Sequence, residues 1–205
     1  MKIAIIGTHS TGKTTIIQKL DERIKQLGFR TTILFELSRE CPFPVNERTS
    51  YEAQAWIQAK HLEQENGVNH EDKIFICDRA TLDNFAYFQN AVSDRDISEW
   101  EARAVEHMST YDLVFKTRKL EINAKDDGFR TTDEDFRKAI DKKIKKLLKK
   151  HKIKHYLLPK TTNYNTHIRY ILKRINDRLA CQISDKQKYT LCQLKFPWII
   201  KKYEK

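Results

Sequence analysis

The sequence predicts an α/β protein whose core is a mostly parallel β-sheet covered by helices on both faces. Three observations support this fold class. Short apolar segments alternate along the chain with longer segments in which apolar residues recur at helical spacing. The short segments are nearly continuous in apolar residues, as strands buried on both faces are. A glycine-containing loop joins the first short segment directly to the first helical one, and such alternation is typical of βαβ units.

Each element is expected from its own local pattern. Residues 2–6 form a short apolar run that ends at Gly7, and the next strand is β-branched and apolar. The strands are expected at residues 2–6, 31–35, 74–77, 113–115 and 154–158. Apolar residues three and four positions apart, such as Ile16, Leu20 and Ile24, predict the first helix. The helices are expected at residues 13–27, 50–64, 82–91, 97–108, 134–151 and 164–179.

The organisation of the chain favours one domain, because its 205 residues show no internal repeat and no linker rich in Pro, Gly and Ser. We expect this domain to cover residues 1–179, with a polar lid at about 118–133. Residues 180–205 are basic, and we expect this extension to pack back on the same domain through apolar residues that include Phe196 and Trp198.

Charge is divided unevenly along the chain. The formal net charge is +11, yet residues 1–110 contain 13 Lys and Arg against 17 Asp and Glu. Residues 111–205 contain 26 against 11, so the positive excess belongs to the C-terminal half. A basic region over residues 137–160 can attract an anionic partner, including nucleic acid, although lysines around an apolar stripe are also typical of a solvated helix.

Composition also excludes several classes of protein. No stretch approaches the ~18 consecutive apolar residues that span a bilayer, and the start of the chain does not resemble a signal peptide. The four cysteines show no CxxC spacing, and the seven histidines form no metal-binding pair. We therefore expect a cytoplasmic protein with reduced thiols, no membrane association and no histidine-based metal site.

The strongest functional motif is the segment GTHSTGKT, which matches GxxxxGK[ST] between the first strand and the first helix. Its glycines let backbone N–H groups point at phosphate oxygens, and the helix N-terminus adds partial positive charge. In this motif Lys13 bridges the β- and γ-phosphates of ATP and Thr14 ligates Mg²⁺. The expected ATP-binding residues are Gly7, Thr8, His9, Ser10, Thr11, Gly12, Lys13, Thr14 and Thr15.

The loop alone does not distinguish a kinase from other nucleotide-binding enzymes. A GTPase would carry an NKxD motif that reads the base, and the nearest string is Asn123-Ala124-Lys125-Asp126, where the lysine stands one place late. No DxxG motif follows the third strand either, so a GTPase is rejected.

Charged residues follow the second and third strands, where parallel sheets gather their chemistry. Asp78 is predicted to ligate Mg²⁺ together with Thr14, the alternative being a helix N-cap. Glu36 is predicted to be the general base for an acceptor hydroxyl, the alternative being a surface ion pair with Arg39. Arg79 is predicted to bind the acceptor or the transferring phosphoryl group, the alternative being an ordinary ion-pair partner.

The segment DDGFR, which ends at Arg130, has the composition of a mobile lid. On closure Arg130 would neutralise charge on the transferring phosphoryl group, and an ordinary surface loop is the alternative.

With these residues in place, the chain resembles the P-loop nucleoside and nucleotide kinase superfamily. Within it, the chain is similar to the AAA-type ATP-binding family that includes the ribosylnicotinamide kinase domain of bacterial NAD regulators. The matching segments are IGTHSTGKTT, FELSRE, ICDRATLDNFAY and DDGFR, all within residues 1 to about 140. The resemblance implies a three-layer P-loop NTPase fold with strand order 2-3-1-4-5 and a lid. It also implies that Glu36 and Arg79 face the acceptor, that Arg130 belongs to the lid, and that adenine lies near residues 158–162.

These observations lead to three hypotheses about function. The first is an ATP- and Mg²⁺-dependent phosphotransferase for a small nucleoside-like or nucleotide acceptor. The second is a kinase of RNA or DNA ends, favoured by the basic C-terminal half, and the third is a nucleotide-dependent switch or assembly ATPase. Residues 41–49 and 180–205 match no known acceptor-site pattern, so the sequence leaves the acceptor and the oligomeric state open.

Overall fold

The computed structural model describes residues 1–45, 49–67, 73–92, 94–119 and 133–182 of the protein. Most of the expected lid and nearly all of the C-terminal extension, including Phe196 and Trp198, lie outside these described residues.

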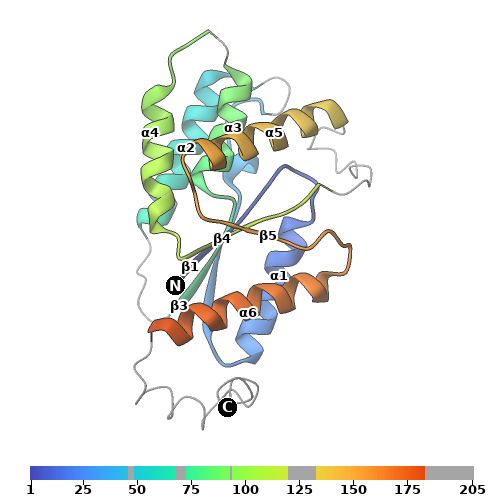
Figure 1. Ribbon diagram of the computed structural model, residues 1–205. Coiled ribbons are helices and arrows are strands. Elements are labelled where there is room, and N and C mark those ends of the chain that lie inside the picture. The colour runs from blue at the N-terminus through green and yellow to red at the C-terminus, as the bar shows by residue number, and fades with distance from the viewer. Residues whose placement is uncertain (46–48, 68–72, 93, 120–132, 183–205) are drawn as a thin grey trace.

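Five parallel strands form a single sheet in the order β2-β3-β1-β4-β5 (Figure 1). This finding confirms the predicted fold class and the strand order that the resemblance implied. The strands are β1 (Lys2–Ile6), β2 (Arg30–Leu34), β3 (Lys73–Asp78), β4 (Leu113–Lys116) and β5 (Tyr156–Leu157). The fifth strand has two residues where five were expected, because it lies at the edge of the sheet and pairs only with the last two residues of β4.

Within the described residues, six helices and two short 3₁₀ helices lie between the strands or follow the last of them. The helices are α1 (Lys13–Gln26), α2 (Tyr51–Asn66), α3 (Thr81–Ala91), α4 (Ser98–His107), α5 (Glu134–Lys150) and α6 (Tyr164–Gln182), and the 3₁₀ helices are η1 (Leu37–Arg39) and η3 (Met108–Thr110). Helices α1 and α6 cover one face of the sheet, and α2 to α5 cover the other (Figure 1). Helix α6 continues beyond its expected end at residue 179.

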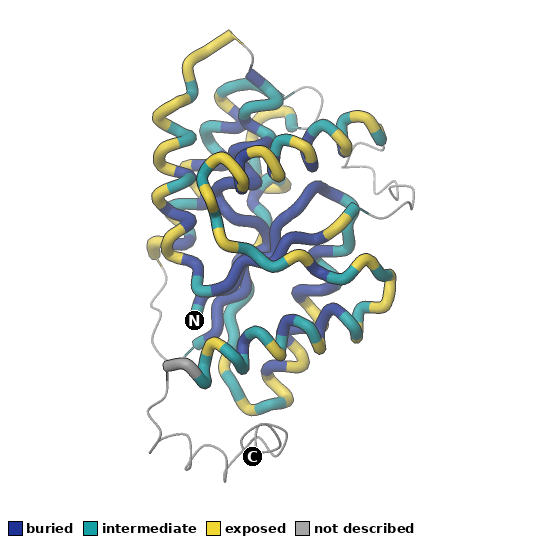
Figure 2. Tube along the Cα trace, in the orientation of Figure 1, coloured by how far each residue is buried: buried dark blue, intermediate teal, exposed yellow. Residues whose placement is uncertain are grey.

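Two apolar cores lie on opposite faces of the sheet, and β1 contributes to both. Ala4 and Ile6 pack against the α2–α5 layer, whereas Ile3 and Ile5 pack against α1 and α6. All four side chains have no exposed surface, and Figure 2 shows the central strands buried between the two layers. Because β1 is fixed on both faces, the loop that follows it begins from a rigid point at the carboxyl edge of the sheet.

Side-chain caps define the starts of two helices on the α2–α5 layer. Ser50 accepts a hydrogen bond from the backbone N–H of Ala53 and caps α2. Asp133 caps α5 by accepting from the backbone N–H groups of Asp135 and Phe136.

In the described part of the chain, no helix combines the length and the apolar character needed to cross a membrane.

Candidate active site

The loop between β1 and α1 adopts a backbone that favours glycine at two positions. Gly7 has φ 141° and Gly12, the residue before the first turn of α1, has φ 78°. A Cβ atom on Gly7 would lie 2.1 Å from Oγ1 of Thr117, which follows β4. A Cβ on Gly12 would lie 3.1 Å from the hydroxyl of Tyr164, at the start of α6. Both glycines are therefore required by the backbone angle and by close neighbours from distant parts of the chain.

Lys13 is buried in the first turn of α1, beneath this loop. Its Nζ donates a hydrogen bond to the backbone oxygen of Thr8 at 2.9 Å, which places the ammonium inside the curve of the loop. Burial and the nearby Arg79 guanidinium lower the pKa of Lys13 to about 8, and Asp78 and Glu36 act in the opposite direction. The Lys13 ammonium therefore lies where it can form an ion pair with an anion bound in the loop.

Thr14 and Asp78 form the second polar contact at the head of α1. The Thr14 hydroxyl donates to Asp78 Oδ2 at 3.0 Å, because Asp78 ends β3 and stands beside Ile5 of β1 in the sheet register. Asp78 is buried, and no group in the described ranges hydrogen-bonds its Oδ1. A buried carboxylate oxygen without a partner, beside a hydroxyl, is a fitting place for a hard cation.

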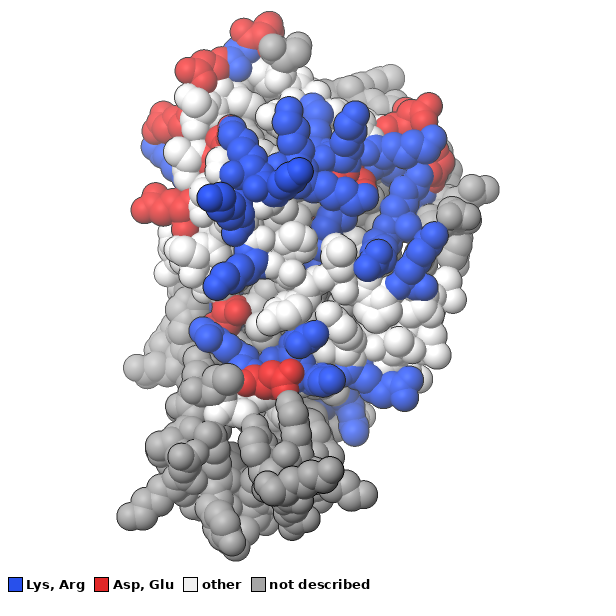
Figure 3. All heavy atoms as spheres, in the orientation of Figure 1, with Lys and Arg blue, Asp and Glu red and all other residues white. Residues whose placement is uncertain are grey.

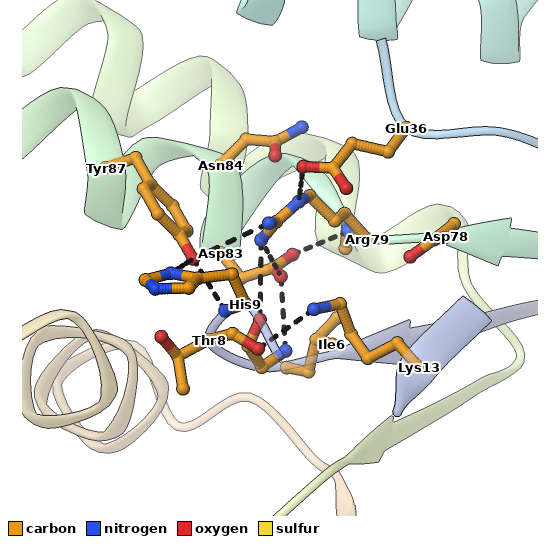
Figure 4. Close-up of polar contacts among 12 residues, drawn as sticks. Ile6, Thr8, His9, Lys13, Glu36, Asp78, Arg79, Asp83, Asn84 and Tyr87 are labelled. Carbon is orange, nitrogen blue, oxygen red and sulfur yellow. Dashed lines mark hydrogen bonds and ion pairs between the residues drawn. The ribbon is translucent and has the colours of Figure 1, made fainter. Parts of the chain in front are cut away.

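Arg79 connects the loop to the second strand. Its backbone has φ 91°, a conformation that residues other than glycine rarely adopt, and it turns the side chain back over the loop. The guanidinium donates to Glu36 Oε1 at 2.7 Å and to the backbone oxygen of Gly7 at 3.3 Å (Figure 4). Although burial lowers the pKa of Arg79, the charge of Glu36 raises it well above its ordinary value. Glu36, the predicted base, thus pairs with Arg79 at the site.

Asp83 is a site residue that sequence reasoning missed. Its side chain is fully buried on the first turn of α3, and Oδ2 accepts from the backbone N–H of Gly7 at 3.2 Å and from Arg79 at 3.4 Å. Oδ1 accepts from the backbone N–H of Ala80 at 2.6 Å (Figure 4). Burial raises the pKa of this carboxyl despite these partners. The Asp83 carboxylate therefore links the phosphate loop, the Arg79 guanidinium and the start of α3 through hydrogen bonds.

Tyr87, one turn further along α3, reaches the same loop. Its hydroxyl accepts from the backbone N–H of His9 at 2.9 Å and lies 3.2 Å from His9 Nδ1. The Arg79 guanidinium lies over the Tyr87 ring, 4.7 Å from its centroid. The His9 ring also contacts Phe136 of α5, with 5.8 Å between ring centroids. Helices α3 and α5 therefore meet over the phosphate loop through this histidine.

The arginine that approaches the loop from α5 is Arg137. It is buried, forms an ion pair with Glu134, and donates to the backbone oxygen of Ser10 at 3.4 Å. Arg137 stands on the same helical face as Ile140 and Ile144, so a charged residue on a predicted apolar stripe was the available signal. Arg130, the lid arginine expected from the sequence, lies outside the described residues.

The remaining predicted residues lie around the same loop. Thr15 is half-buried in the first turn of α1, and the Thr11 hydroxyl donates to the backbone oxygen of Thr8 at 3.0 Å. The segment at 158–162, expected near adenine, is held by Arg118, whose Nε donates to the backbone oxygen of Leu158 at 2.9 Å. This segment leads directly into Tyr164, the neighbour of Gly12.

Several solved structures share this fold. Deoxyadenosine kinase from M. mycoides has 19% identity and a TM-score of 0.60, with 86% of this chain and 99% of that chain covered. Thymidylate kinase from Ehrlichia chaffeensis has 18% identity and a TM-score of 0.61, with 85% and 98% covered. A NadR protein in complex with NR has 17% identity and a TM-score of 0.66, with 84% of this chain and 50% of that chain covered.

The comparison with family models covers more than the loop motif. No curated protein matches the sequence. A family model described as an AAA domain matches residues 2–166, which include the phosphate loop, Glu36, Asp78, Arg79 and all five strands. The match spans most of the chain, and the chain therefore belongs to the AAA domain family.

Proposed function

We propose that the protein is an ATP- and Mg²⁺-dependent phosphotransferase acting on a small nucleoside-like or nucleotide acceptor. The observation that carries this proposal is Arg79, which contacts both Glu36 and the backbone oxygen of Gly7. A phosphate-binding loop needs no such partner to hold ATP. The Glu36–Arg79 pair beside the loop supplies the two groups that an acceptor requires. Glu36 is a proton acceptor, and Arg79 carries a positive charge.

Thr14 and Asp78 are the residues that would hold Mg²⁺. Their oxygen atoms are the ligands that this ion prefers, and it usually takes one or two protein ligands, with waters and phosphates as the others. When bound, the ion would neutralise charge on the β- and γ-phosphates.

Four side chains would then act on the reacting groups. Lys13 would hold the β- and γ-phosphates, and Glu36 would accept the proton of the attacking hydroxyl. Arg79 would stay between the acceptor and the loop. Arg137, fixed at Ser10 by α5, would stabilise negative charge on the transferring phosphoryl group from the lid side, the role that the sequence assigned to Arg130.

Affinity for ATP is expected to fall as the pH rises above about 8. Below that pH the ligand-free protein already carries the Lys13 ammonium. Above it, binding must take up a proton, because bound phosphates raise the pKa of the lysine. The dissociation constant, measured by titration calorimetry, should stay level near pH 7 and then rise by up to about tenfold per pH unit. Lys13→Arg keeps the charge and should remove this rise, and a level profile in the wild type would contradict the role of Lys13.

A basic surface favours a polynucleotide acceptor as the second candidate. Figure 3 shows Lys and Arg side chains gathered along α5 and, below them, along α6. The exposed residues of this surface are Lys138, Lys142, Lys145, Lys146, Lys149, Lys150, Arg169, Lys173 and Arg178. Lys142, Lys146 and Lys149 form no ion pair within the described residues. Such a surface can follow a phosphate backbone, although it equally attracts a mononucleotide.

One panel of acceptors tests these alternatives together. Wild-type protein is incubated with ATP, Mg²⁺ and nucleosides, nucleotides, nicotinamide riboside, or RNA and DNA oligonucleotides with 5′-hydroxyl ends. We expect a small acceptor to be phosphorylated by the wild type and not by Lys13→Ala. Phosphorylation of oligonucleotides alone would favour the second candidate, and ATP hydrolysis unaffected by every acceptor would favour a switch or assembly ATPase. If nothing is phosphorylated while both proteins bind ATP equally, the proposal fails.

A further inference from the structure

A series of buried polar side chains leads from the amino-terminal end of β1 to α3, and the proposed chemistry does not use it. It begins at Lys2 on β1, passes through Glu65 and His61 on α2, and ends at Asn84 on α3. The exposed fractions of these residues are 4%, 1%, 2% and 6%. Buried polar residues in direct succession fix one another's hydrogen-bonding roles, because each donor must meet an acceptor.

Glu65 accepts hydrogen bonds from its neighbours in this series of buried side chains. It pairs with Lys2 and accepts from the Tyr111 hydroxyl at 2.7 Å, while His61 Nε2 lies 2.6 Å from its Oε1. Burial alone would raise the pKa of Glu65, but the hydrogen bonds from His61 and Lys2 and the charge of Lys2 lower it below its ordinary value. Glu65 is therefore a carboxylate, which can only accept hydrogen bonds.

The state of Glu65 determines the tautomer of His61. Because the carboxylate only accepts, Nε2 of His61 must carry the proton, and Nδ1 of the neutral ring is then an acceptor. Asn84 Nδ2 lies 3.1 Å from Nδ1 and donates to it. If His61 were doubly protonated, its Nδ1–H would face the Nδ2 amide of Asn84, and two hydrogen-bond donors would meet without an acceptor. The doubly protonated ring would also add a buried cation beside the Lys2–Glu65 pair, whose charge is already balanced.

The same logic fixes the amide of Asn84. With Nδ2 engaged by His61, Oδ1 is the end that remains for other partners, and within the described residues nothing hydrogen-bonds it. A flipped amide would place Oδ1 against the lone pair of His61 Nδ1, which is repulsive. Figure 4 shows the Asn84 side chain directed from α3 toward Glu36 and Arg79, the pair assigned to the acceptor.

We propose that Asn84 is a specificity-determining residue and that His61 positions it, so that the acceptor must present an N–H or O–H donor to Asn84 Oδ1. This inference rests on the proposed function, because it assigns the acceptor to the space beside Glu36. An amide, an exocyclic amine, an imide N–H or a sugar hydroxyl meets the requirement. An analogue with a carbonyl or a methylated nitrogen at that point leaves Oδ1 buried without a partner and is rejected.

Three leucine variants test the proposal with the acceptor that the panel identifies. Asn84→Leu keeps the size of the side chain and should raise the KM for the acceptor about tenfold or more, while the KM for ATP changes less than about twofold. His61→Leu frees the amide to flip and should raise the acceptor KM by about three- to tenfold. His107→Leu is the matched control, because His107 lies 3.6 Å from Glu65 Oε2 and contacts no atom of Asn84 in the described structure. It should leave the acceptor KM unchanged.

A double variant separates positioning from mere structural support. If His61 acts through Asn84, adding His61→Leu to Asn84→Leu should not raise the acceptor KM further. Additive effects would overturn the positioning role. An acceptor KM unchanged by Asn84→Leu would overturn the specificity role and leave the proposed function standing. If no acceptor in the panel is phosphorylated, both the proposed function and the specificity role of Asn84 are contradicted.

Nitrogen NMR of the histidine rings gives a readout that needs no acceptor. We expect the His61 ring to carry its proton on Nε2, the nitrogen that faces Glu65. Protonation on Nδ1, or on both ring nitrogens, would present the amide nitrogen of Asn84 to the acceptor and would overturn the inference.

Discussion

The Asp83→Ala variant is expected to unfold about 10 °C below the wild type. The substitution removes a fully buried carboxylate that accepts from two backbone N–H groups and from Arg79. Removing one partner of a buried ion pair costs about 3–5 kcal/mol, and a domain of this size loses about 2–4 °C for each kcal/mol. The same change releases the N–H of Gly7, so affinity for ATP should fall as well.

Differential scanning calorimetry measures the midpoint, and Asp96→Ala is the matched control. Asp96 also accepts a backbone N–H at the start of a helix, from Ser98, but it is exposed. Its replacement should move the midpoint far less. A midpoint for Asp83→Ala within about 2 °C of the wild type would show that Asp83 does not hold the loop and Arg79 together.

The Glu36→Gln variant should lose most of the phosphotransferase activity while it remains folded. A glutamine keeps an oxygen that can accept from Arg79 but cannot take the proton of an attacking hydroxyl. General-base catalysis contributes about 10²–10⁴-fold, so kcat should fall by this factor. The KM for ATP should stay near the wild-type value, because Arg79 keeps its contacts with Gly7 and Asp83.

Steady-state kinetics with the identified acceptor measures this effect. Glu40→Gln removes an exposed carboxylate a few residues further along the same segment and should leave kcat unchanged. If the kcat of Glu36→Gln lies within about threefold of the wild type, Glu36 is not the base and its carboxylate only orients Arg79.

Local patterns in the sequence were sufficient to predict most of the fold. Strand β1 and the loop after it follow from a short apolar run and a motif with four fixed residues, and both depend on neighbours in the chain. The approach of Thr14 to Asp78 follows once β1 and β3 are adjacent, because parallel strands end at one edge of a sheet. The strand order itself came from the resemblance and not from any local pattern.

The roles of Asp83 and Arg137 could not be predicted from local patterns. Asp83 looks like an ordinary residue of a helix start, and only the folded chain places it against Gly7, 76 positions away. Arg137 stands out as a charged residue on the apolar stripe of its helix, but that pattern does not indicate that its partner is the backbone oxygen of Ser10, 127 positions away. The partner of Glu36 was also uncertain, because the unusual backbone of Arg79 decides where its side chain points. Each of these contacts depends on tertiary geometry.

The contact between Gly7 and Thr117 limits how this protein can change over evolutionary time. A side chain at position 7 would collide with the Thr117 hydroxyl. Thr117 in turn donates to the backbone oxygen of Ile6 and meets the Thr11 hydroxyl at 2.8 Å, so it cannot easily shrink or withdraw. Any lineage that replaced the first glycine of the loop would also have to change the segment that follows β4, and the same holds for a designer of new nucleotide preferences.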